Sequence, residues 1–157
     1  MLILRPISHK DREVLRLATF YNLNRNKDRF SLRDIDLNPQ FSHYYDTLNP
    51  YDFGFIAQRH LQIFGVVWLK YFTANDPGYG FVSEEIPELS ISVFPEYRNS
   101  GFGKKLLKYA IEEAKSLTIS AISLSVEIDN PARSLYLSFG FTPVNSQNDN
   151  ETMILEL

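Results

Sequence analysis

The sequence predicts a single α/β domain in which a mixed β-sheet carries helices on its faces. Segments typical of strands and of helices alternate along the chain in the order β-α-α-β-β-β-α-β-α-β-β. A length of 157 residues suits one domain, and a hydrophobic content of 44% is enough for a substantial core. No repeat, low-complexity run or linker divides residues 1–157, so we expect one domain throughout.

The first half of the chain predicts one strand, two helical stretches and a hairpin. Apolar residues at helical spacing indicate the first helix, while Ser31 is a typical N-cap for the second, which Pro39 is expected to break. Aromatic and β-branched residues on both sides of a short turn favour an antiparallel hairpin. These elements are expected at residues 2–4, 11–21, 31–48, 53–58 and 62–72.

The second half continues with a long loop at residues 73–86 and then strands and helices in turn. Pro131 suits the first position of a helix and Gly140 its exit. The elements are expected at residues 88–94, 101–117, 121–127, 131–139, 141–144 and 153–157. Alternation along the strand at 88–94 predicts two faces, one with Leu89, Ile91 and Val93 and the other with Glu88, Ser90, Ser92 and Phe94.

Composition excludes several classes of function. A formal net charge of −3 argues against broad nucleic-acid binding, and the lack of cysteine removes disulfides, thiolate metal sites and cysteine nucleophiles. The three histidines have no metal-ligand spacing, so we expect no metal. No stretch is long enough to span a membrane, and the first residues lack a signal-peptide pattern. The sequence therefore favours a cytoplasmic protein without a membrane partner.

A basic turn with two glycines stands where the helix at 101–117 begins. The turn reads Arg98-Asn99-Ser100-Gly101-Phe102-Gly103 and is followed by Lys104-Lys105. It lacks the Lys-Ser/Thr end of a Walker A loop, and Leu106 replaces the third glycine of the dinucleotide fingerprint. Glycines before a helix N-terminus still favour an anion site, because free N–H groups there point outward. The alternative is an ordinary turn with solvated lysines.

Two motifs in the second half resemble those of a known family. Arg98-x-x-Gly101-x-Gly103 after a strand, followed by Lys-Lys-Leu-Leu, resembles the acetyl-CoA signature of the GNAT superfamily of N-acetyltransferases. The segment Asn130-Pro-Ala-Arg-Ser-Leu-Tyr-Leu-Ser-Phe-Gly-Phe141 is similar to the family's second motif, with alanine two positions after the asparagine. The resemblance covers about a third of the chain and implies a GNAT-like, mostly antiparallel sheet. Residues 1–85 match the family only in pattern.

The resemblance also implies how acetyl-CoA would be bound. The pyrophosphate would rest on the main chain of the glycine turn, and the pantetheine arm would pair with the preceding strand. The residues so implicated are Arg98, Asn99, Ser100, Gly101, Phe102, Gly103 and Lys104 in the turn, and Ile91, Ser92 and Val93 in the strand. Asn130 would cap the next helix and also contact the cofactor. The side chains of Ile91 and Val93 could serve as core at the same time.

Two side chains are candidates for proton transfer. Glu88 begins the pantetheine strand and would take the proton of the acceptor ammonium, directly or through water. Its alternative is an ordinary surface glutamate, with Glu84, Glu85 and Glu127 as rivals. By resemblance, Tyr136 would protonate the leaving thiolate. Its alternative is core packing, because it shares a helical stripe with neighbouring apolar residues, namely Ala132, Leu135 and Phe139.

The remaining chemistry concerns the acceptor. The N–H of Val93 would polarise the thioester carbonyl, and the lack of cysteine favours direct attack by a primary amine of a small molecule, peptide or protein. Plausible acceptor-pocket residues are aromatic or acidic: Tyr44, Tyr45, Tyr71, Phe72, Tyr79, Phe81, Asp46, Glu84 and Glu85. A non-catalytic acyl-CoA sensor or interaction module is the alternative function. A homodimer is left open.

Overall fold

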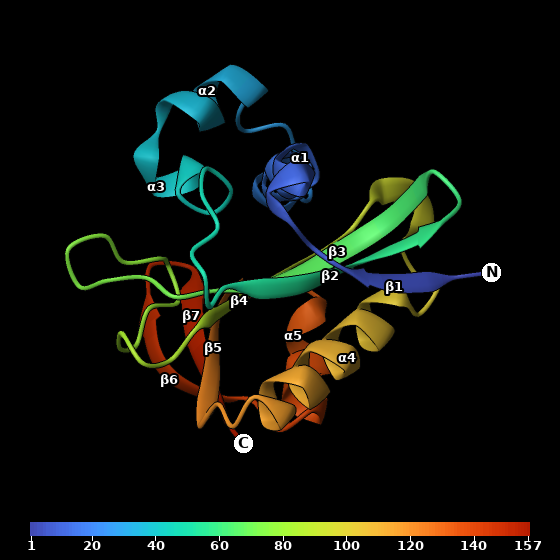
Figure 1. Ribbon diagram of the computed structural model, residues 1–157. Coiled ribbons are helices and arrows are strands. Elements are labelled where there is room, and N and C mark those ends of the chain that lie inside the picture. The colour runs from blue at the N-terminus through green and yellow to red at the C-terminus, as the bar shows by residue number, and fades with distance from the viewer. The chain divides into compact units, whose positions relative to one another are not determined.

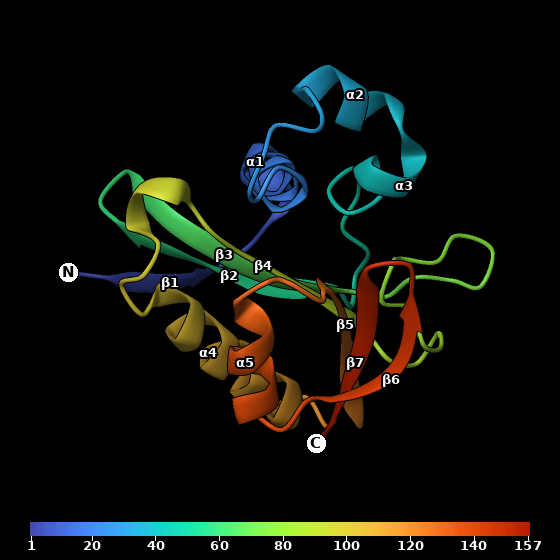
Figure 2. The same ribbon diagram turned by 180° about the vertical axis from the view of Figure 1, so that it is seen from behind.

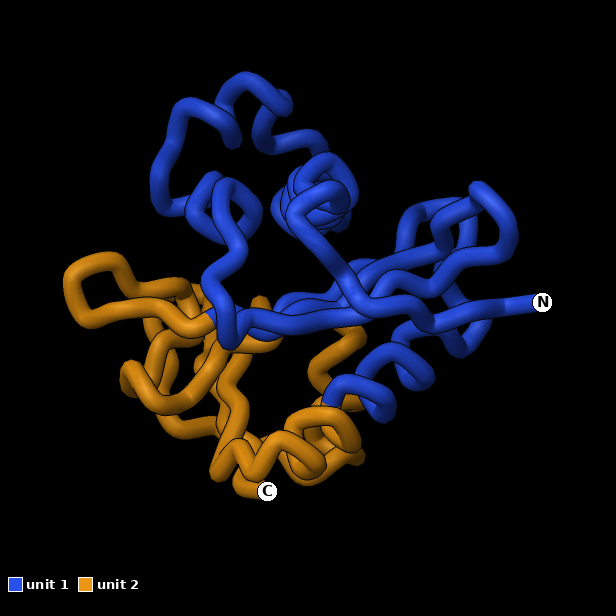
Figure 3. The backbone as a smooth tube through the Cα atoms, in the orientation of Figure 1, with its two compact units in different colours: residues 1–70, 90–110 blue, residues 71–89, 111–157 orange.

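The computed structural model describes residues 1–157. The chain divides into two compact units, shown in different colours in Figure 3. Unit 1 comprises residues 1–70 and 90–110, and unit 2 comprises residues 71–89 and 111–157. The expectation of one domain over residues 1–157 therefore stays a prediction.

Seven strands form one sheet in the order β1-β2-β3-β4-β5-β7-β6. The pairs β1–β2, β2–β3, β5–β7 and β6–β7 are antiparallel, whereas β4 and β5 are parallel. The strands are β1 Ile3–Pro6, β2 Phe53–Arg59, β3 Gln62–Lys70, β4 Glu88–Val93, β5 Ala121–Glu127, β6 Thr142–Gln147 and β7 Asn150–Glu156. The predicted fold class, a mixed and mostly antiparallel α/β sheet, is confirmed.

Five α-helices and two short 3-10 helices join the strands. The α-helices are α1 Arg12–Leu23, α2 Leu32–Leu37, α3 Pro39–Ser42, α4 Phe102–Ser116 and α5 Ala132–Ser138, and the 3-10 helices are His9–Asp11 and Pro95–Tyr97. Ser31 caps α2, because its Oγ accepts from the Asp34 N–H at 3.1 Å while Asp34 accepts from the Ser31 N–H at 2.9 Å. The helix stops at Asn38, which is extended, and Pro39 begins the next turn, so the predicted break is confirmed. None of the helices is both long and apolar enough to cross a bilayer.

Unit 1 is layered around β2 and β3. Helices α1, α2 and α3 lie on one side of these strands and the first turns of α4 on the other, as both views show (Figures 1 and 2). The indole N–H of Trp68 donates to the Tyr44 carbonyl at 3.0 Å and ties β3 to the segment after α3. The strands β3 and β4 approach closely at Gly65, where an added Cβ would lie 2.6 Å from the Ser92 carbonyl oxygen.

Unit 2 holds α5 and the strands that close the sheet. Leu124, Phe141 and Met153 are buried there. The hairpin β6–β7 extends further than predicted, to Gln147 and from Asn150, because the two residues between them form a tight turn with Asn148 at φ 55°. The polar residues beside that turn lie on an exposed edge strand, so hydrophobic periodicity does not reveal them.

Candidate functional site

The glycine turn presents a row of unpaired main-chain donors. Asn99 and Gly101 adopt positive φ values of 62° and 82°, and α4 begins at Phe102. The N–H groups of residues 99–104 make no hydrogen bond within the protein, and the next one, Lys105 N–H, donates to the Gly101 carbonyl at 3.2 Å. No atom lies within 4 Å of where a Gly101 side chain would begin, so the space over the turn is open. The helix dipole adds to this arrangement, which suits a bound anion.

Aromatic packing holds this turn in place. Phe102 stacks on Phe64 of β3, with ring centroids 5.0 Å apart and planes at 18°. Tyr97 meets the same Phe64 ring edge-on at 4.6 Å, and its hydroxyl accepts from the Gln62 side chain at 2.6 Å. The start of α4 is therefore anchored to β3 on the side facing the core, and its N–H groups stay free on the other.

The three cations of the turn behave differently. Lys104 and Lys105 are exposed and form no ion pair. Arg98 instead donates from Nε to the Val93 carbonyl at 3.2 Å, which fixes its side chain against the end of β4. The lysines and the remaining guanidinium N–H groups of Arg98 are the charges available to an anion on the turn.

The strand β4 is covered on both faces within unit 1. Ser92 is only 4% exposed, whereas Ile91 and Val93 are half-buried. Val93 faces α4, because its Cγ2 lies 3.6 Å from where a Gly103 side chain would begin. The opposite face is covered by α1, since Phe94 contacts Tyr21 with centroids 5.2 Å apart. Burial of Ser92 follows from that cover.

Glu88 is a buried carboxylate in unit 2. It is 4% exposed, and its Oε1 accepts from the Gly80 N–H at 3.0 Å. The alternative of an ordinary surface glutamate is therefore wrong. Two of the other candidate bases lie in the exposed part of the loop. Glu84 accepts a hydrogen bond from the Ala74 N–H at 2.9 Å, and Glu85 accepts one from the Ser83 hydroxyl at 3.4 Å.

Tyr136 is the buried residue of its helix. It is 7% exposed, its ring meets Phe141 edge-on at 5.9 Å, and its hydroxyl forms no hydrogen bond. Burial raises the pKa of Tyr136 to about 12, so the phenol stays protonated at neutral pH. The side chain of Asn130 accepts from the N–H of Ala132, the first residue of α5, at 2.9 Å. Its contact with a cofactor stays a prediction.

The candidate acceptor aromatics separate into engaged and accessible side chains. Tyr45 is 1% exposed and donates to Asp36 at 2.6 Å, and Tyr44 and Phe72 are also buried. Asp46 is paired with Arg12 at 2.6 Å. Tyr79, by contrast, is 50% exposed. Of these residues, the long loop therefore offers the more accessible aromatic surface.

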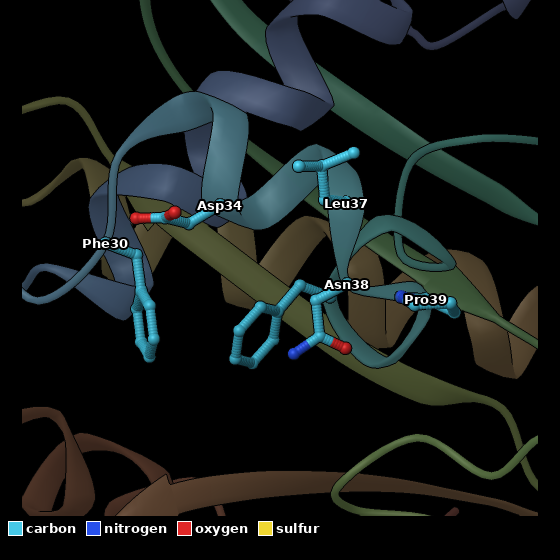
Figure 4. Close-up of a pocket in the computed structure, with 6 residues that line it drawn as sticks. Phe30, Asp34, Leu37, Asn38 and Pro39 are labelled. Carbon is cyan, nitrogen blue, oxygen red and sulfur yellow. The ribbon is translucent and has the colours of Figure 1, made fainter.

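A hollow that the sequence did not reveal lies beside α2 and α3. It measures about 470 Å³ and is lined by Phe30, Asp34, Leu37, Asn38, Pro39 and Phe41 (Figure 4). The rings of Phe30 and Phe41 lie 5.0 Å apart, and the Asp34 carboxylate points toward Phe30. The break at Pro39 was its only sequence signal, because the turn there separates the two short helices whose residues form the walls.

Comparison with known proteins agrees with these features. The acetyltransferase (GNAT) family model matches residues 17–141. A putative [ribosomal protein bS18]-alanine N-acetyltransferase of Bacillus subtilis is 29% identical over 106 residues, which cover 65% of this chain and 62% of that protein. The chain spans less than two thirds of the length of the curated relatives it matches.

Solved structures share the fold. A ribosomal-protein-alanine N-acetyltransferase from Brucella melitensis has a TM-score of 0.70 and 24% identity, with 99% of each chain covered. The structure of yncA from Salmonella typhimurium, a putative acetyltransferase with its cofactor acetyl-CoA, has a TM-score of 0.70 and 20% identity, covering 99% of this chain and 93% of that one. The chain belongs to the acetyltransferase (GNAT) family.

Proposed function

We propose that the protein is an acetyl-CoA-dependent N-acetyltransferase that moves the acetyl group directly to a primary amine. The observation that carries this proposal is the row of six free N–H groups at residues 99–104, where α4 begins. A pyrophosphate is the kind of anion that such a row binds. The match to the GNAT family supports coenzyme A as the molecule that carries this pyrophosphate.

The donor would be held by main-chain groups and two lysines. In the proposal, the pyrophosphate lies over residues 98–104, and the pantetheine arm runs along Ile91, Ser92 and Val93 of β4. The acetyl-CoA named in the Salmonella typhimurium structure supports the same co-substrate here. Asn130 keeps its side-chain nitrogen for the cofactor, because its oxygen is occupied by the Ala132 N–H.

The reaction needs a base, a polarised carbonyl and a proton donor. Glu88 takes one proton from the acceptor ammonium, the free amine attacks the thioester carbon, and the N–H of Val93 stabilises the oxygen that becomes negative. The new C–N bond forms as the C–S bond breaks. Tyr136 gives its proton to the departing sulfur and regains one from the nitrogen, which loses its second proton as it becomes the amide. The raised pKa of Tyr136, about 12, supports this role because the phenol is protonated when the thiolate leaves.

The acceptor in this proposal is the α-amine of a polypeptide that begins with alanine. The names of both curated relatives support it, because each is a [ribosomal protein bS18]-alanine N-acetyltransferase by name. The proposal places the enzyme in the cytoplasm.

The test measures free thiol released from acetyl-CoA with an alanine-first peptide and a panel of small amines. The wild type should release thiol with the peptide, while Glu88→Gln and Tyr136→Phe should each lower kcat by about 100-fold or more. Full activity in both variants would refute these roles. Binding of CoA without turnover on any amine would favour the non-catalytic sensor instead.

A separate variant tests the glycine turn. Gly101→Glu should abolish the rise in melting temperature that CoA gives the wild type, because its carboxylate competes for the same N–H groups. Gly101→Ala is the matched control, since it carries a side chain at the same backbone position without the charge. If CoA stabilised Gly101→Glu as it does Gly101→Ala, the pyrophosphate assignment would be wrong.

A further inference from the structure

Ser123 is a buried polar residue that the proposed reaction has not yet used. It lies in β5 with no exposed surface, and its Oγ makes no hydrogen bond. An unpaired hydroxyl in the interior costs free energy, and buried polar groups are nearly always satisfied. We therefore expect this hydroxyl to have a hydrogen-bond partner when the protein is active.

The neighbour of Ser123 across the sheet is Glu88. The two residues face each other in the parallel pairing of β4 and β5, and the Ser123 N–H donates to the Pro87 carbonyl at 3.1 Å. Paired residues on adjacent strands point to the same face, with strands roughly 4.8 Å apart. The Ser123 hydroxyl and the Glu88 carboxylate thus share one face and lie side by side, without a direct hydrogen bond between them.

A loop closes over the same place. Gly80 donates its N–H to Glu88 at 3.0 Å, and its backbone rests on the next peptide of β5. A side chain on Gly80 would begin 2.6 Å from the carbonyl carbon of Leu124 and 2.8 Å from the nitrogen of Ser125. The loop therefore holds the Glu88 carboxylate from one side, and Ser123 of β5 lies beside Glu88 on the neighbouring strand.

We propose that Ser123 is a positioning residue for Glu88. Its hydroxyl and the carboxylate hold one water between them, which relays the proton of the acceptor ammonium to Glu88. Polar groups further apart than a hydrogen bond are commonly bridged in this way, and a buried water needs at least two such partners. The proton count closes: the ammonium loses one proton, the water accepts and releases one, Glu88 gains one, and Ser123 stays neutral.

This inference rests on the proposed function, and its test compares Ser123→Ala with the wild type on acetyl-CoA and an alanine-first peptide. We expect kcat to fall about tenfold or more, while KM for acetyl-CoA and for the peptide changes little. Ser123→Cys keeps a weak donor, so its kcat should lie between the two. Ser120→Ala, the same change at an exposed site before β5, should leave kcat and both KM values unchanged.

A double variant separates positioning from structure. In a Glu88→Gln background, Ser123→Ala should cause no further loss of kcat, because the group it positions is already disabled. The inference is overturned if Ser123→Ala keeps the wild-type kcat, or if it lowers kcat equally with and without Glu88. A wild type that acetylates no amine would instead overturn the proposed function, so the two failures are distinguishable.

Discussion

Replacing Gly65 by alanine tests how closely β3 packs against the strand proposed to bind pantetheine. The new Cβ would lie 2.6 Å from the Ser92 carbonyl oxygen, 3.1 Å from the Val93 Cα and 3.3 Å from the Leu106 side chain. An ordinary contact begins at 3.4 Å, so the Ser92 main chain must move by 3.4 − 2.6, or about 0.8 Å. Because the nearest atom is backbone rather than the end of a flexible side chain, the strand itself has to shift.

Two opposing effects decide the size of the change. Overpacking costs about 1–3 kcal/mol, while removing a glycine from a strand returns about 0.5–1 kcal/mol. The clash wins, and the net loss of about 1–2 kcal/mol should lower the melting temperature by about 2–8 °C for a chain of this size. The rise in melting temperature with CoA should also shrink, because Ser92 and Val93 are displaced.

Thermal melts with and without CoA measure both effects, and Gly103→Ala is the matched control for the melting temperature of the free protein. Its Cβ would meet only the Val93 side chain, at an ordinary 3.6 Å, and alanine is favoured over glycine in a helix by about 1 kcal/mol. Gly103→Ala should therefore raise the melting temperature of the free protein. A Gly65→Ala variant that melts at or above the wild type would refute the close packing of β3 on β4.

Three further predictions concern ionisable groups. Two hydrogen bonds from Arg16, at 2.8 and 2.7 Å, hold the pKa of Asp36 down at about 2. The ionised Asp36 therefore stabilises the fold fully above the ordinary carboxyl pKa, and this stabilisation is lost as the pH falls through 2. In urea titrations, Asp36→Asn should flatten the loss of stability below about pH 4. Lys70 and Asp52 pair at 2.8 Å, with side chains that are 4% and 0% exposed. Lys70→Met should therefore lower the free energy of unfolding by about 3–5 kcal/mol in denaturant titrations, because it leaves the Asp52 charge buried without its partner. A loss below about 1 kcal/mol would contradict the burial of the pair. Because burial raises the pKa of Tyr136 to about 12, kcat should not fall through phenol ionisation up to about pH 10, and a fall there that Tyr136→Phe removes would contradict that burial.

Local signals explain why the elements were predictable. The residues Leu106, Leu107, Ala110 and Ala114 repeat at helical spacing, and all four are fully buried on the inner face of α4. Ser31 caps α2 and Pro39 begins α3 through contacts within one helical turn, so both effects can be predicted without the rest of the fold. The same holds for the glycine turn, whose positive φ at Gly101 only glycine adopts without strain.

Burial was harder to predict, because it depends on segments distant in the sequence. The pattern of β4 left open whether Glu88 is an ordinary surface glutamate, because its burial comes from the backbone of Gly80 in the long loop. Ser92 is covered on the α1 side, and no pattern within β4 indicates that cover. The orphan hydroxyl of Ser123 is likewise visible only once the pairing of β4 with β5 places it beside Glu88.

Mass spectrometry of an acceptor peptide tests the central claim most directly. The peptide begins with alanine and is incubated with acetyl-CoA and the wild type, Glu88→Gln or no protein. We predict the mass of one acetyl group added at the peptide's α-amine with the wild type, and at most background with Glu88→Gln. If no amine gains an acetyl group although CoA raises the melting temperature of the wild type, the protein binds coenzyme A without catalysing transfer, and the proposed function is wrong.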